Sequence, residues 1–175
     1  MTRVLVTGAF GRLGQVVLRE MKARDLHVTA MAREKPANRR TARRMREFVD
    51  DVVWGDVRHA DLGPLVDRAD AVVHLAGMLP PHTETAPDLA ESVNVGGTLR
   101  LVEAIEAAAH DPLLVYASSV TVLGYPSLPV LRTADDPVGP SDHYTRHKIA
   151  AEERLRNGSA RHAILRVGCR SMHAR

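Results

Sequence analysis

The chain has 175 residues, of which 45% are hydrophobic and 26% charged, and its formal net charge at pH 7 is +3. This composition predicts one domain with a hydrophobic core, and the single cysteine, Cys169, excludes a disulfide framework or a cysteine-rich metal site. One Trp, two Phe and three Tyr are too few for a base-stacking surface, so we expect no binding to nucleic acid. Neither a signal peptide nor a membrane-spanning apolar run is found, so we expect a cytoplasmic protein that does not bind membranes.

The chain begins with a strand, a glycine turn and a helix. Val4 to Val6 form a short apolar run, glycines follow at positions 8, 11 and 14, and a helical pattern starts at Arg12 with Leu13, Val16, Val17 and Met21 on its apolar face. Gly8 would permit a tight turn, Gly11 would let a pyrophosphate approach the backbone, and Gly14 would let helix and strand pack closely. The helix N-terminus offers free N–H groups to the phosphates. This order predicts a dinucleotide cradle; the alternative is a glycine-rich turn without a ligand.

The second strand is predicted over 27–31, and the residues after it bear on the choice of cofactor. An acidic residue at this point would bind the adenosine ribose hydroxyls, whereas arginine accommodates a 2′-phosphate. The chain has Ala32-Arg33 here, and the first carboxylate after the strand is that of Glu34. Arg33, with help from Arg12, therefore favours NADP over NAD; the alternative is an ordinary surface arginine.

Residues 36–47 are basic and polar, and they predict a loop followed by a short helix. Five arginines lie in this segment, at positions 39, 40, 43, 44 and 46. Such a cluster could attract a polyanion or a cofactor phosphate. For most of these arginines we favour a solvated helix face.

A third strand is predicted over 49–54, and Asp56 follows it in Gly55-Asp56-Val57. Asp56 could accept a hydrogen bond from the adenine amino group or cap a helix that begins near Asp61. The fourth strand, within 70–77, ends in small residues that would let the backbone approach the cofactor, and His74 inside it is expected to be a packed histidine.

The second half continues the alternation of strands and helices. It predicts a loop over 78–88 on the substrate side, a long helix over 89–109 that contains Asn94, a strand over 113–117, an irregular functional loop over 124–141, a helix over 143–156 and a strand over 162–167. The fold class is therefore α/β, a doubly wound parallel sheet with strand order 3-2-1-4-5-6.

Tyr144 and Lys148 are four residues apart, on one face of the helix predicted over 143–156. A neighbouring ammonium favours a phenolate and would lower the pKa of Tyr144. Ser119, near the end of the fifth strand, could hydrogen-bond a substrate oxygen while Tyr144 moves a proton and hydride passes to or from a nicotinamide. His143 and His147 lack an evident third ligand, so we expect no metal site.

The chain resembles the extended short-chain dehydrogenases/reductases of the NAD-dependent epimerase/dehydratase family. The motifs that carry the resemblance are Thr-Gly-Ala-Phe-Gly-Arg-Leu-Gly (7–14), Gly-Asp-Val (55–57), His-Leu-Ala-Gly (74–77), Asn-Val-Gly-Gly-Thr (94–98), Ser118-Ser119 and Tyr144-x-x-x-Lys148. The resemblance implies an NAD(P)-binding Rossmann domain over 1–168 with Ser119, Tyr144 and Lys148 as catalytic trio. It implies cofactor contacts from Gly8, Phe10, Gly11, Arg12, Leu13, Gly14, Arg33, Asp56, Val57, Leu75, Ala76, Gly77, Asn94, Tyr144 and Lys148.

Three departures from the family pattern affect the expected function. Leu123 replaces a usual tyrosine, Val120-Thr121 replace the Asp-Glu pair of sugar dehydratases, and residues 169–175 no longer resemble the family. We therefore expect a family member without most of its C-terminal substrate-binding region, and sugar dehydration is disfavoured.

The function predicted from these observations is hydride transfer at a hydroxyl or carbonyl carbon of a sugar-nucleotide-like or other small substrate. The cofactor is NADP, with NAD as the alternative. The competing hypothesis is a non-catalytic dinucleotide-binding module or an inactive fragment. By resemblance, a homodimer through helices 89–109 and 143–156 is also expected, which the mass in solution would check.

Overall fold

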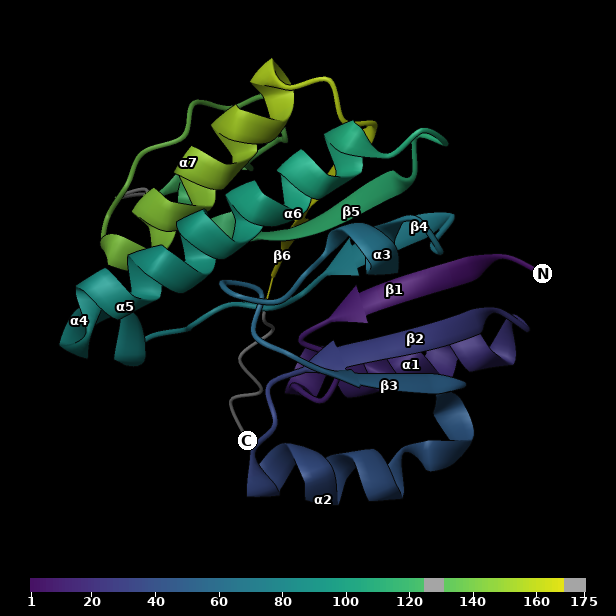
Figure 1. The fold of residues 1–175 in the computed structure, drawn as a ribbon. Helices are drawn as coiled ribbons and strands as arrows, with labels where there is room; N and C mark the ends of the chain where they lie inside the picture. The colour runs from purple at the N-terminus through teal and green to yellow at the C-terminus, as the bar shows by residue number, and fades with distance from the viewer. Residues whose placement is uncertain (125–130, 169–175) are drawn as a thin grey trace.

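A computed structural model of the chain describes residues 1–124 and 131–168. Its core is a six-stranded, all-parallel sheet in the order β3-β2-β1-β4-β5-β6, which confirms the predicted fold class and strand order (Figure 1). The strands are β1 (Arg3–Thr7), β2 (His27–Ala32), β3 (Asp51–Trp54), β4 (Ala71–His74), β5 (Leu113–Ser119) and β6 (His162–Val167).

Apolar side chains alternate between the two faces of the sheet and build a core on each. In β1, Leu5 belongs to one buried cluster, whereas Val4 and Val6 belong to the other. The first cluster packs against helices on one face and includes Leu101 and Leu155, and the second packs against α1 through Leu18. Because both faces are covered, the strands are nearly continuous apolar runs, as parallel sheets require.

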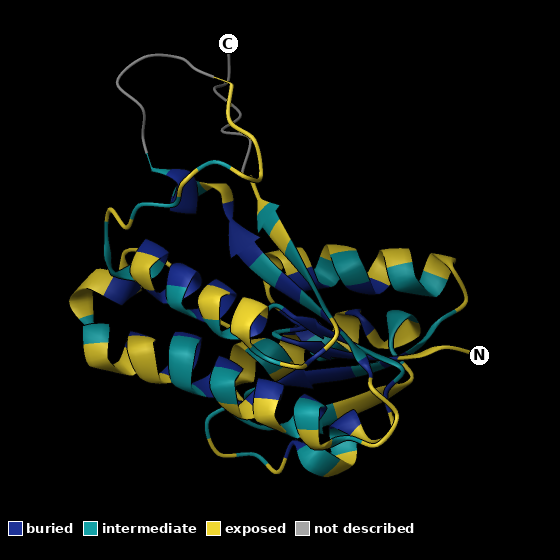
Figure 2. Ribbon diagram, turned by 90° about the horizontal axis from the view of Figure 1, so that it is seen from above, coloured by how far each residue is buried: buried dark blue, intermediate teal, exposed yellow. Residues whose placement is uncertain are grey.

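Helices cover both faces, with α1 and α2 on one side and α3, α6 and α7 on the other (Figure 1). The helical segments are α1 (Arg12–Ala23), α2 (Pro36–Arg44), η1 (Arg46–Phe48), α3 (Gly63–Val66), α4 (His82–Thr85), α5 (Pro87–Glu91), η2 (Ser92–Gly96), α6 (Gly97–Ala107), η3 (Val120–Leu123) and α7 (His143–Asn157). Their buried residues face the sheet, while exposed residues cover the outside (Figure 2). Within the described residues, every helix is too short or too polar to cross a bilayer.

Several segments differ from the sequence-based prediction. Residues 36–47, predicted as a loop plus a short helix, form α2 from Pro36 onward, and η1 follows it. The helix predicted over 89–109 is divided into α5, a π-helical turn η2 and α6, because one turn widens around Asn94. The loop predicted over 78–88 contains the short helix α4. The third strand begins at Asp51 instead of residue 49.

The inward face of α1 is also different from the predicted one. Leu13 and Val16, expected on its apolar face, are 41% and 54% exposed, whereas Gly14 and Leu18 are buried. Val17 and Met21, predicted on the same face, are partly buried and pack against the core. Gly14 offers no side chain, so the backbone of α1 itself approaches the turn before it. The apolar pattern therefore placed this face about one residue out of phase.

Because all six strands are parallel, their carboxyl ends lie at one edge of the sheet. Gly8, Arg33, Leu75 and Ser119 follow or end four different strands, and Asp56 lies two residues beyond a fifth. This edge therefore gathers the predicted site residues of separate segments, as expected for ligand binding in an open α/β sheet.

Two predicted segments fall wholly or partly outside the described residues. They are the tail 169–175 with Cys169, and residues 125–130 of the loop predicted over 124–141.

Candidate active site

The glycine turn after β1 is built from close backbone contacts. Gly8 has φ +67°, and a Cβ on it would lie 2.6 Å from the backbone nitrogen of Ala76. A Cβ on Gly14 would lie 2.3 Å from the carbonyl oxygen of Ala9. Both positions therefore require glycine, Gly8 for the turn and for the approach of the β4 loop, and Gly14 for the approach of α1.

Gly11, the N-cap of α1, lies on the outside of the same turn. It is exposed, and among the described residues a Cβ on it would have only the carbonyl oxygen of Gly8 within 4 Å, at 3.2 Å. Arg12 and Leu13 are also exposed, whereas Phe10 is buried and its ring lies 5.8 Å from that of Trp54. The N–H of Gly11 donates to the Gly8 carbonyl at 3.0 Å. The N–H groups that follow in the first turn of a helix have no intrahelical partner, so the start of α1 is suited to an anion.

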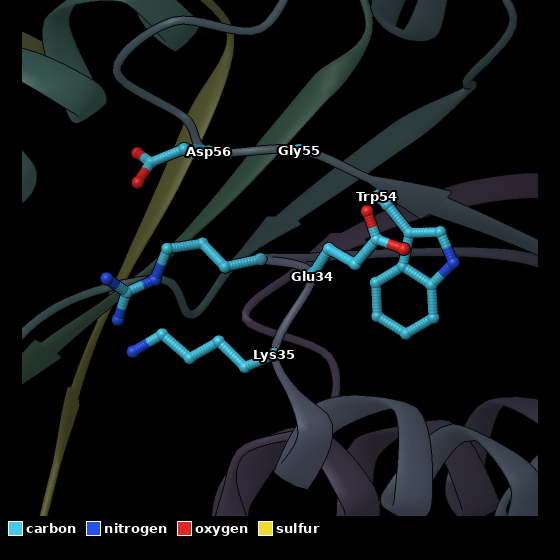
Figure 3. A pocket seen from close by; sticks show the side chains of 6 residues that line it. Glu34, Lys35, Trp54, Gly55 and Asp56 are labelled. Carbon is cyan, nitrogen blue, oxygen red and sulfur yellow. The ribbon is translucent and has the colours of Figure 1, made fainter.

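A shallow pocket of about 290 Å³ lies beside this turn, beyond the ends of β2 and β3. Its lining residues are Arg33, Glu34, Lys35, Trp54, Gly55 and Asp56. In Figure 3 the Lys35 side chain extends toward the side of the pocket where the Asp56 carboxylate lies, and the Glu34 carboxylate lies beside the Trp54 ring. Two cationic side chains, those of Arg33 and Lys35, therefore border one cavity.

Asp56 is bound by Arg58 and does not cap a helix. Its carboxylate accepts hydrogen bonds from the Arg58 backbone nitrogen at 3.0 Å and from Nε and Nη2 at 3.0 and 2.8 Å. These hydrogen bonds from the Arg58 side chain lower the pKa of Asp56 to about 2. The next helix, α3, starts only at Gly63, so the prediction that Asp56 caps a helix near Asp61 is wrong. Val57, the residue after Asp56, packs against Gly97.

The end of β4 is held by a buried polar chain. His74 is 1% exposed and its ring nitrogens lie 2.6 Å from Thr7 Oγ1 and 3.0 Å from Thr98 Oγ1. Burial lowers the pKa of His74 to about 3, so the ring is neutral. His74 is a packed histidine, as predicted.

Leu75, Ala76 and Gly77 continue from His74 along the carboxyl edge, and Asn94 holds the chain just beyond them. The Asn94 side chain accepts a hydrogen bond from the Met78 N–H at 2.6 Å and donates one to the Met78 carbonyl at 3.0 Å. Asn94 is 2% exposed. Its side chain therefore fixes the loop beside the glycine turn and leaves little surface for direct contact with a ligand.

Ser119 is the last residue of β5, and its hydroxyl begins the 3-10 turn η3. Its Oγ lies 2.7 Å from Thr121 Oγ1 and accepts a hydrogen bond from the Thr121 N–H at 3.2 Å. Ser119 is 8% exposed. Thr121 occupies one of the positions that carry an acidic pair in sugar dehydratases, and here it supports the Ser119 hydroxyl.

Tyr144 and Lys148 lie on α7, which begins with a capping box at Asp142. The Lys148 ammonium is buried, donates to the Ala117 carbonyl at 2.7 Å, and lies 4.6 Å from the Tyr116 ring centroid and 5.8 Å from that of Tyr144. Burial lowers the pKa of Lys148 to about 8. The two side chains thus share one face of the helix, as their spacing predicts.

The expected effect of Lys148 on the pKa of Tyr144 is wrong for the free protein. Burial raises the pKa of Tyr144 above its usual value, and the Ser119 side chain offsets only part of that effect. The Lys148 ammonium is directed to the Ala117 carbonyl and does not compensate for the burial. Tyr144 is therefore a protonated phenol at neutral pH.

Sequence reasoning missed the buried charge that supports this site. Glu152 is fully buried one turn beyond Lys148, and it accepts hydrogen bonds from Ser118 at 2.5 Å, from Arg156 at 2.7 Å, and from Arg166 at 2.8 and 3.1 Å. Ser118 and Arg166 come from β5 and β6, so Glu152 ties α7 to both strands. Its spacing of four residues from Lys148 was the available signal.

Lys35 was missed as well, although it lies two residues beyond Arg33 and borders the same pocket. For metals, the described residues contain no group of three or more His, Cys, Asp or Glu side chains placed to hold an ion. The His143 and His147 rings lie 6.3 Å apart on α7.

Comparison with known proteins agrees with this geometry. The family model for the NAD dependent epimerase/dehydratase family matches residues 4–172. The chain is 34% identical to L-arabinose 1-dehydrogenase (NAD(P)(+)) from Haloferax volcanii, over 96% of this chain and 67% of that protein. It is 32% identical to the methionine adenosyltransferase 2 subunit beta of Rattus norvegicus, over 94% of this chain and 46% of that one.

Among solved structures, the fold matches UDP-glucuronic acid 4-epimerase from Bacillus cereus in complex with UDP-glucuronic acid and NAD. The TM-score is 0.79 at 24% identity, over 94% of this chain and 56% of that one. The chain spans about half the length of most of the curated relatives it matches. The chain belongs to the NAD dependent epimerase/dehydratase family.

Proposed function

We propose that this chain is the cofactor-binding and catalytic part of an NADP(H)-dependent oxidoreductase or epimerase that acts on a hydroxyl or carbonyl carbon. The observation that carries the proposal is the convergence, at one edge of the sheet, of the bare glycine turn, the cationic pocket and the Ser119–Tyr144–Lys148 group. The substrate that we propose is a sugar-nucleotide-like or other small molecule.

The residues at the turn fit a dinucleotide. The first turn of α1 would receive the pyrophosphate on backbone N–H groups that have no intrahelical partner, and Gly11, which has no side chain, would leave the approach open. Phe10, Arg12, Leu13, Asp56, Val57 and the segment from Leu75 to Gly77 would surround the adenosine and the phosphates. Asn94 and Lys148 would complete the nicotinamide end, Asn94 by fixing the loop and Lys148 by binding the ribose.

Arg33 and Lys35 support NADP(H) as the preferred cofactor. Both line the pocket beyond β2, where the adenosine ribose would lie, and an arginine there could bind the 2′-phosphate through two parallel hydrogen bonds. The two carboxylates in the same pocket are already paired, Glu34 with Arg39 and Asp56 with Arg58. Binding is measured by fluorescence titration with NADPH and NADH.

Arg33→Gln and Lys35→Gln should each weaken NADPH binding about tenfold or more, the value of one charge-assisted hydrogen bond, and change NADH binding little. Arg68→Gln, an exposed arginine at the opposite edge of the sheet, is the matched control. Equal losses for both cofactors would argue against the 2′-phosphate assignment. Binding of neither cofactor by the parent chain would refute the cofactor site.

The bound nicotinamide supplies or accepts a hydride. Ser119 would donate a hydrogen bond to the substrate oxygen, and Tyr144 would transfer a proton at its Oη. Tyr144 is a phenol in the free protein, so it could donate the proton in carbonyl reduction. Alcohol oxidation needs the phenolate and should therefore accelerate as the pH rises.

A carbonyl-substrate screen with NADPH, followed by Tyr144→Phe, tests the catalytic part. Turnover that disappears in Tyr144→Phe, while NADPH still binds, would support Tyr144 as acid and base. Full turnover in the variant would remove Tyr144 from the mechanism.

A second candidate function is a non-catalytic dinucleotide-binding module. It is supported by the direction of the Lys148 ammonium toward Ala117 instead of the Tyr144 hydroxyl, and by the similarity to a protein named as a subunit of another enzyme. Tight NADPH binding without turnover on any substrate screened, in parent and Tyr144→Phe alike, would favour this function.

A further inference from the structure

The arginines of residues 33–46 concentrate positive charge in one part of the chain. Of 24 basic and 21 acidic residues in all, this segment contains seven basic and one acidic. Its formal charge is therefore +6, whereas the remaining residues together carry −3. The cofactor pocket uses only Arg33 and Lys35 of these seven.

The outer face of α2 displays most of the remaining charge. Arg40, Arg43 and Arg44 are exposed, and Arg46 follows in η1. Within residues 1–124 and 131–168 no carboxylate forms an ion pair with any of these four. The buried side of the helix is formed by Thr41. We call Arg40, Arg43, Arg44 and Arg46 the α2 arginine face.

The helix that carries this face begins at the cofactor pocket. Lys35 is both the N-cap of α2 and a lining residue of the pocket. Arg39, one turn into the helix, lies 5.8 Å from the centroid of the Trp54 ring, which lines the same pocket. The α2 arginine face therefore lies on a helix whose first residues border the pocket.

We propose that the α2 arginine face attracts the anionic dinucleotide toward its pocket and so sets the rate of NADPH association, without contacting the bound cofactor. This inference rests on the proposed cofactor site. A surface of one sign next to a binding cleft raises the local concentration of an oppositely charged ligand and speeds its capture. NADPH, with a 2′-phosphate and a pyrophosphate, is the ligand class that such a field favours, and NADH should be attracted less.

The alternative occupant is a nucleic acid backbone. The scarcity of aromatic residues argues against it, and the one tryptophan lies in the pocket. Because α2 begins at the cofactor pocket, its position favours the dinucleotide.

Stopped-flow association of NADPH tests the proposal in the full chain. The variant Arg40→Gln/Arg43→Gln/Arg44→Gln should lower the association rate constant about threefold or more at low salt, and parent and variant should converge as salt screens the field. The dissociation rate constant should not change. The corresponding triple Lys variant keeps the charge and should keep the rate, which also separates charge from any loss of helix stability.

The matched control removes three exposed arginines at the amino edge of the sheet, Arg24, Arg68 and Arg161. It lowers the net charge equally but leaves the α2 arginine face intact, so the association rate should remain close to that of the parent. An equal drop in both Gln variants would assign the effect to net charge and overturn the proposal.

Two other outcomes are also decisive. Normal NADPH association in the α2 variant, with or without loss of binding to a single-stranded oligonucleotide, overturns the steering role but leaves the cofactor site standing. Absence of NADPH binding by the folded parent overturns both.

Discussion

Replacing Glu152 with alanine should cost a large part of the stability of this chain. The carboxylate is fully buried and paired with Arg166, whose side chain is only 11% exposed. Removing it leaves a guanidinium and the Ser118 hydroxyl without their buried partner. Breaking a buried ion pair in this way costs about 3–5 kcal/mol, against a total of about 5–15 kcal/mol for a typical domain.

Arg156 adds little to this value, because it is about half exposed and water can replace its partner. For a chain of this length, the loss corresponds to a decrease in Tm of about 6–20 °C. Urea unfolding followed by circular dichroism measures the free energy directly, and an unchanged m value would show that parent and variant unfold through the same change in exposed surface.

The control is Glu20→Ala, which breaks an exposed i,i+4 pair with Arg24 in which both side chains are more than 60% exposed. This change should cost less than about 0.5 kcal/mol. The double variant Glu152→Ala/Arg166→Met removes the orphaned charge and should be more stable than Glu152→Ala alone. A loss below about 1 kcal/mol in Glu152→Ala, or a double variant that is less stable still, would refute the role assigned to the buried charge.

Three further predictions concern the glycine turn and two titrating groups. Gly8→Ala should destabilise the fold by about 1–2 kcal/mol or more because of the positive φ at this residue, and the clash of the new Cβ with the β4 loop adds to that cost. Gly96 lies in helical backbone with open space around it, so Gly96→Ala should be neutral or stabilising by up to about 1 kcal/mol. Urea unfolding measures both changes. Because the pKa of His74 is lowered to about 3, the unfolded chain binds an extra proton below pH 6.5, so stability should fall by up to about 1.4 kcal/mol per pH unit from 6.5 downward. His74→Asn should lack that slope, and parallel pH profiles of parent and variant would contradict the assignment. The pKa of Asp56, lowered to about 2, should contribute stability that is complete above pH 4 and lost as the pH falls through 2, and an Asp56→Asn variant with unchanged acid unfolding would contradict it.

The sequence was sufficient for those features that depend on periodicity and on steric necessity. Alternating apolar strands and helices predicted the strand order, and the spacing of Gly8 and Gly14 predicted backbone contacts that the structure contains. Features that depend on competition among tertiary partners were not predictable in the same way. Asp56 accepts hydrogen bonds from Arg58, two residues away, and Lys148 donates one to the Ala117 carbonyl. In each case the charged group forms its hydrogen bond with a partner that lies close to it in the folded chain.

The phase error on α1 has a related cause. A pattern of apolar residues indicates an amphipathic face, but the closest approach of this helix is made by Gly14, which has no side chain and no hydrophobic signal. Leu13 and Val16 consequently remain accessible beside the glycine turn. Pattern reasoning is weakest where a backbone, not a side chain, forms the contact.

The π-helical turn η2 makes the chain length between α5 and α6 a determinant of the site. Such a turn contains one residue more than a regular α-helical turn, and in this chain it surrounds Asn94, whose amide holds Met78 by two hydrogen bonds. Deleting a single residue within 92–96 would restore a regular helix and rotate α5 by about 100° relative to α6. A substitution such as Gly96→Ala keeps the number of residues in the turn, whereas a one-residue deletion would move Asn94 off the loop that follows β4.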